Sequence, residues 1–102
     1  MNKRLRKKKG LSKVTKEELW GLDYTLAKYI LPRLIKFKEN AEGHPSNITW
    51  EEYLIILDKM IWSFNYIIKD DSTIDFAELK KKDNRCQEGL HLFAEYFRSL
   101  WI

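Results

Sequence analysis

Three long stretches of the chain place apolar residues three and four positions apart, the spacing of one face of an α-helix. The first runs from Thr15 to about residue 40, the second from Thr49 to about residue 70, and the third from about residue 75 to residue 101. Strand-like alternation is weak throughout, and only 4 Gly and 2 Pro interrupt the 102 residues. The pattern predicts an all-α fold, a three-helix up-down-up bundle with short connecting turns.

Local signals refine these helices. Thr15 and Thr49 each precede a Glu by three residues, which is the spacing of a capping box. Pro32 lies inside the first helix and is expected to kink it. The polar run around Asp83 leaves open a break in the third helix, dividing it into 75–82 and 84–101. The first helix is apolar over so wide an arc that we expect it to pack on two sides.

Positive charge is concentrated at the N-terminus. The first ten residues contain no acid and six cations, which are Lys3, Arg4, Arg6, Lys7, Lys8 and Lys9. The rest of the chain carries 13 basic and 15 acidic residues, so the net charge of +4 conceals a slightly acidic body. Self-repulsion and scarce apolar surface predict a flexible basic tail over residues 1–12, followed by a helical domain over residues 13–102. The six cations are candidate nucleic-acid contacts, and plain solvation is the alternative interpretation.

Residues that carry catalysis or bind metals are sparse. The single cysteine, Cys86, lies in an apolar helical pattern, so we expect a buried apolar group rather than a reactive thiol. His44 and His91 have no neighbours at zinc-ligand spacing, and residues 70–75 lack the glycine of a calcium loop. No phosphate loop, nucleophile elbow or membrane-length apolar run occurs. We therefore expect a non-enzymatic protein of the reducing cytoplasm, with no metal, cofactor or membrane association.

Charged residues interrupt several apolar stretches. These residues are Arg33, Asp58, Lys59, Arg85 and Glu88. One interpretation pairs Asp58 with Arg33 or Arg85 between helices, where an ion pair can fix the helix register. The other gathers them into a polar cleft with an arginine fork that holds an anionic or nucleotide-like ligand. The aromatic rings around such a cleft would be Trp20, Tyr24 and Trp62.

The aromatic residues exceed what a three-helix core of this size needs. Candidate interface residues are Trp50, Tyr96 and Trp101, because exposed aromatic rings often mark contact surfaces. The C-terminal segment is apolar up to Ile102, so we expect it to dock against the bundle or against a second copy. The sequence leaves homo-oligomer formation open.

Three stretches resemble a family of small uncharacterised proteins encoded by tailed bacteriophages. They are LWGLDYTLAKYILPRL (19–34), ILDKMIWSF (56–64) and RCQEGLHLFAEYFRSLW (85–101). They cover most of the predicted helices in the same order. The resemblance implies phage origin and expression in the cytoplasm of a bacterial host, and it transfers no activity and no catalytic residue to this chain.

These observations predict a non-catalytic phage accessory protein that binds a host or phage macromolecule, with its basic tail contacting nucleic acid. Two alternatives remain at this stage. The first is an anti-defence protein that sequesters a nucleotide signal in a helical pocket. The second is a minor structural or assembly component.

Overall fold

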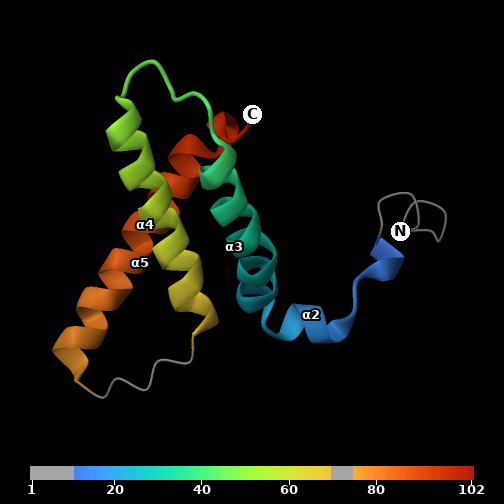
Figure 1. Cartoon of the computed structure of the whole chain (residues 1–102). Helices are drawn as coiled ribbons and strands as arrows, with labels where there is room; N and C mark the ends of the chain where they lie inside the picture. The colour runs from blue at the N-terminus through green and yellow to red at the C-terminus, as the bar shows by residue number, and fades with distance from the viewer. Residues whose placement is uncertain (1–10, 70–74) are drawn as a thin grey trace.

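The chain forms an all-α structure built around a central helix (Figure 1). The computed structural model describes residues 11–69 and 75–102. In these ranges it has no strand and four α-helices, α2 (Lys16–Trp20), α3 (Leu22–Asn40), α4 (Trp50–Ile68) and α5 (Phe76–Tyr96), together with the 3-10 turns η1 (Leu11–Lys13) and η2 (Phe97–Ser99). The all-α class is confirmed, with four α-helices in the described ranges where three were predicted.

Side chains cap the helices where the sequence indicates. Thr15 accepts a hydrogen bond from the backbone N–H of Glu18, whose carboxylate accepts one from the Thr15 N–H at 2.7 Å. Thr49 and Glu52 form the same reciprocal box at the start of α4. Both predicted capping boxes are confirmed. Asp75 opens α5 by accepting from the first free backbone N–H groups of that helix.

The first predicted helix is interrupted at Gly21 and continues through Pro32. Gly21 has φ −128° and ψ 62°, outside the helical region, and it separates α2 from α3. The Thr25 hydroxyl donates to the carbonyl oxygen of Glu18 at 3.2 Å, so it satisfies a carbonyl that the end of α2 leaves unpaired. Glycine has the largest backbone entropy to lose in a helix, so the break falls there.

The break predicted near Asp83 is wrong, because α5 runs without interruption from Phe76 to Tyr96. Asp83 accepts a hydrogen bond from the hydroxyl of Tyr66 on α4 at 2.9 Å. Lys82 and Glu78 form an ion pair one turn apart on α5 at 3.9 Å. The polar run therefore lies on a continuous helix. This helix ends at Tyr96, before the predicted residue 101.

The hydrophobic core is centred on α4. Four of the six residues in the buried cluster belong to this helix, namely Tyr53, Leu57, Met60 and Phe64. The other two, Ala27 and Leu34, come from α3. On α5, Phe93 packs edge-to-face on Phe64 with the ring centroids 4.9 Å apart. The central helix thus buries residues on successive turns, whereas its neighbours each supply one face.

The helices form an open layer. α4 contacts both α3 and α5, but among the described residues no close backbone contact joins α3 to α5. In Figure 1, α2 also projects away from the three long helices. The radius of gyration is 16.7 Å, compared with about 13 Å for a compact domain of 100 residues. Among the described residues of this chain, α4 is the only long helix that contacts α3, so packing of the first helix on two sides is not seen within one copy.

Residues 1–10 of the predicted basic tail lie outside the described residues. The last two residues assigned to it, Leu11 and Ser12, belong to η1. No helix in the described part of the chain is long and apolar enough to cross a membrane.

Candidate functional site

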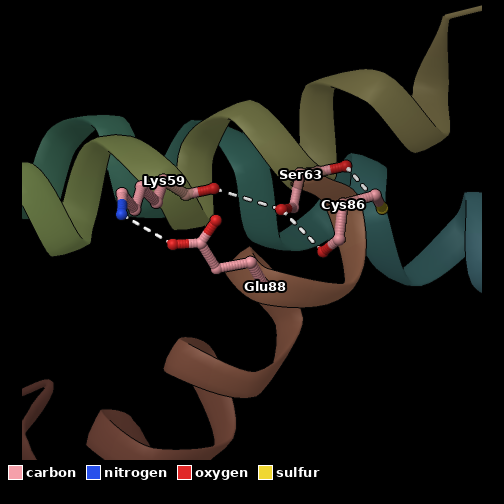
Figure 2. A network of polar contacts seen from close by, with 4 residues as sticks. All are labelled: Lys59, Ser63, Cys86 and Glu88. Atoms are coloured by element: carbon pink, nitrogen blue, oxygen red, sulfur yellow. Dashed lines mark hydrogen bonds and ion pairs between the residues drawn. The ribbon is translucent and has the colours of Figure 1, made fainter. Parts of the chain in front are cut away.

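Small side chains hold α4 and α5 together where they cross, as Figure 2 shows. Ser63 Oγ lies 2.9 Å from the carbonyl oxygen of Cys86 and 3.1 Å from that of Lys59, so its hydroxyl is within hydrogen-bonding distance of both helices. Gly89 is buried at this crossing, and a Cβ added there would lie 1.8 Å from Ser63 Oγ. The crossing is a structural contact in which the backbones approach closely.

Two of the predicted cleft residues form an ion pair at the edge of this crossing. Lys59 Nζ lies 2.6 Å from Glu88 Oε1, and both side chains are about half exposed (Figure 2). A pair this exposed contributes about 0–1 kcal/mol to stability. Lys59 and Glu88 therefore support the structural interpretation of these charges over the polar cleft.

Asp58 does not pair with either arginine, which corrects the sequence prediction. Its carboxylate lies 2.5 Å from Lys38 Nζ near the end of α3. The antiparallel α3 and α4 place Lys38 level with Asp58, whereas Arg33 lies five residues before Lys38 on α3, roughly 7.5 Å away at the helical rise. The pairs Lys59–Glu88 and Tyr66–Asp83 fix the antiparallel register of α4 and α5. In this register Asp58 lies about one helical turn from the level of Arg85.

Both arginines instead stack on aromatic rings. The Arg33 guanidinium lies 3.6 Å from the ring centroid of Tyr29 one turn earlier, and its Nη1 donates to the Tyr29 carbonyl at 2.8 Å. The Arg85 guanidinium lies 4.0 Å from the ring centroid of Trp62. Trp62 is in turn stacked on Tyr66, with the centroids 5.1 Å apart and the planes 8° from parallel. The arginine fork is therefore not assembled by the described residues.

The three candidate interface residues have different surroundings. Trp50 and Tyr96 are partly buried and pack against the core cluster, whereas Trp101 is 77% exposed. Near Trp101, a cavity of about 260 Å³ opens between the α3–α4 connection and the C-terminus. Its lining includes Tyr53, whose hydroxyl donates to the Ser99 carbonyl at 3.4 Å. The C-terminal segment thus lies against the end of the helical layer, with its last two side chains largely outside.

Cys86 is buried, as its sequence environment predicts. Burial raises the pKa of its thiol, and the nearby Asp83 carboxylate raises it further, although the hydrogen bond with Ser63 acts in the opposite direction. A thiol with a raised pKa is a poor nucleophile near neutral pH. Among the described residues, no three His, Cys, Asp or Glu side chains are grouped so as to hold a metal ion.

The surface next to the basic tail carries exposed aromatic rings. Trp20, at the end of α2, is 92% exposed, and Tyr24 and Tyr29 on the first turns of α3 are also exposed. The Lys28 ammonium lies 5.2 Å from the ring centroid of Tyr24. The spacing of four residues between Tyr24 and Lys28, and between Tyr29 and Arg33, could have indicated both stacked pairs in advance. Trp20 and Tyr24 therefore lie on the surface instead of around a polar cleft.

No protein-family model, curated protein or solved structure matches this chain.

Proposed function

We propose that this protein is a non-catalytic nucleic-acid-binding module, in which the basic tail supplies most of the attraction. The observation that carries the proposal is the division of charge along the chain. Residues 1–40 contain twelve basic and four acidic side chains, whereas residues 41–102 contain seven basic and eleven acidic ones. A chain divided in this way presents one end to phosphate groups and keeps the other away from them.

The exposed aromatic rings beyond the tail fit a single-stranded ligand. Bases stack on exposed aromatic side chains without regard to sequence, while nearby cations follow the phosphate backbone. Trp20 is the most exposed of the large apolar side chains in the described residues. Only eight residues separate it from Leu11, which directly follows the basic tail residues 1–10. We therefore assign Trp20 the stacking contact and the six tail cations the phosphate contacts.

The proposal also includes the predicted origin and location of the protein. We place the protein among the accessory proteins of a tailed phage, acting in the cytoplasm of the bacterial host on a host or phage macromolecule. We do not extend the proposal to sequestration of a nucleotide signal, because that function was motivated by an arginine fork, and Arg33 and Arg85 each stack on a separate aromatic ring.

The first experiment measures the mobility shift of duplex and single-stranded nucleic acid at several salt concentrations. The full chain is compared with a chain starting at Ser12 and with a full-length variant whose six tail cations are replaced by Gln. We expect a shift that weakens with salt and is lost in both altered chains. If all six cations contact phosphate, the slope of log K against log salt falls by about 4 to 5 units. An unchanged shift in the Gln variant would refute the assignment to the tail.

The second experiment tests the stacking contact with Trp20→Ala and the matched control Trp101→Ala, since both side chains are largely exposed. Stacking on one base contributes about 1–3 kcal/mol, so we expect Trp20→Ala to weaken single-strand binding about fivefold or more. Trp101→Ala should leave binding unchanged. Equal effects of the two substitutions would contradict a specific role for Trp20.

A further inference from the structure

A row of apolar side chains on α3 lies outside the group that packs against the core cluster, and within this row the Arg33 guanidinium covers one face of the Tyr29 ring. Leu22, Leu26 and Tyr29 are exposed by 45%, 49% and 60%, and their spacing of four and three residues continues with a step of four to Arg33. We call these four residues the α3 seam. At 3.6 residues per turn, the α3 seam lies roughly a third of the way around the helix from the buried Ala27 and Leu34. It is therefore distinct from the face that packs on α4.

The spacing of the α3 seam is that of helices that pack side by side in a coiled coil. Alternating steps of three and four keep apolar side chains facing a neighbouring helix. Leu19 on α2 is also exposed, by 56%, but the break at Gly21 places it on a separate helix, outside the α3 seam. An apolar row exposed on a protein surface often marks a contact with another molecule. We therefore expect a helix with a matching apolar pattern to cover the α3 seam.

We propose that the α3 seam is a homodimer interface, in which α3 of one copy packs antiparallel against α3 of a second copy. The four residues are placed symmetrically about a point between Ala27 and Lys28. An antiparallel twofold arrangement about that point sets Leu26 of one copy against Tyr29 of the other, twice. The outer layers then pair Leu22 with Arg33, again twice. The row is thus complementary to itself, as a twofold interface requires.

Charge along these helices selects the antiparallel direction. The N-terminal end of α2–α3 carries Lys16 beside the acids Glu17, Glu18 and Asp23, and the C-terminal end carries Glu39 beside the bases Arg33, Lys36 and Lys38. The two ends therefore keep net charges of opposite sign. An antiparallel pair sets each acidic end beside a basic end, whereas a parallel pair would set like charges together. Asp23 makes no ion pair among the described residues, and Arg33 of the second copy lies opposite the adjacent Leu22 in this arrangement.

The inference does not depend on the proposed function, because it concerns the chain without nucleic acid. If both hold, the dimer carries two copies of the basic tail. Two linked contacts on one nucleic-acid strand bind more tightly than either contact alone.

The test is sedimentation equilibrium of the full chain over a wide range of concentration. We expect the wild type to approach the mass of two chains as the concentration rises. Leu26→Glu should remain a monomer, because it buries two carboxylates near the twofold axis. The matched control is Ile55→Glu on α4, where the side chain is also about half exposed but lies outside the α3 seam. This variant should dimerise like the wild type, and circular dichroism shows whether each variant keeps its helices.

The direction of packing is tested by exchanging charges. Arg33→Glu should raise the dimer dissociation constant about threefold to tenfold, and the double variant Asp23→Arg, Arg33→Glu should restore it. Wild type that stays a monomer, a mass above two chains, or a Leu26→Glu variant that dimerises like Ile55→Glu would overturn the interface. Failure of the double variant to recover would overturn the antiparallel direction.

Discussion

Gly89 allows α5 to cross α4 with the two backbones in close approach. A Cβ at this position would lie 1.8 Å from Ser63 Oγ and 2.4 Å from the carbonyl oxygen of Lys59. Rotation of a side chain cannot relieve the second contact, because that oxygen belongs to the backbone. We expect Gly89→Ala to lower the free energy of unfolding by about 1–3 kcal/mol, although alanine favours helix by about 1 kcal/mol over glycine. Chemical denaturation measures the change.

Gly43 is the matched control for this substitution. A Cβ added there would meet nothing within 4 Å, so Gly43→Ala should change the free energy of unfolding by no more than a few tenths of a kcal/mol. Similar losses in the two variants would show that the crossing at Gly89 is not close-packed.

The two capping boxes have the same chemistry and different consequences. Thr49 starts α4, which carries most of the core, whereas Thr15 starts the short α2, which has no buried residue. Thr49→Ala should lower the free energy of unfolding by about 1 kcal/mol. Thr15→Ala should leave the global midpoint unchanged and speed amide exchange within Lys16–Trp20, because a peripheral helix opens locally. Equal shifts of the two midpoints would mean that α2 unfolds together with the core.

For single helices, the sequence predicts those features that depend on residues close together in the chain. The boxes at Thr15 and Thr49 are local, and both predictions are confirmed. The break expected at Asp83 is absent, and the Tyr66 hydroxyl that bonds this residue belongs to another helix. The break at Gly21 was missed because a single glycine does not disturb the apolar spacing on either side of it. Tertiary contacts can override local preference in either direction.

The packing of the helices against one another could be predicted less well from the sequence. The apolar arc of the first helix indicates that two of its sides need cover, but it does not say how many helices are available to cover them. Likewise, the charges at Arg33 and Asp58 stand out in the sequence, but their partners depend on the register between helices. The six tail cations lie outside the described residues, so their role stays a prediction.

The central position of α4 predicts how stability is distributed over the molecule. Among the described helices, α4 is the one that contacts both α3 and α5, whereas α2 contacts α3 alone. Native-state amide exchange should therefore be slowest around Leu57–Phe64 and fastest in α2.

The fully buried Leu57 provides the variant that tests this distribution. Leu57→Ala should cost about 2–5 kcal/mol and reduce the protection of α3 and α5 together, because both pack on the helix that it weakens. Ile55→Ala, at an exposed position on the same helix, should leave protection nearly unchanged. If α3 kept its protection while that of α4 and α5 fell, a helix outside this copy would have to be stabilising α3. Such protection should then disappear in Leu26→Glu, which separates support by a second copy from support by α4.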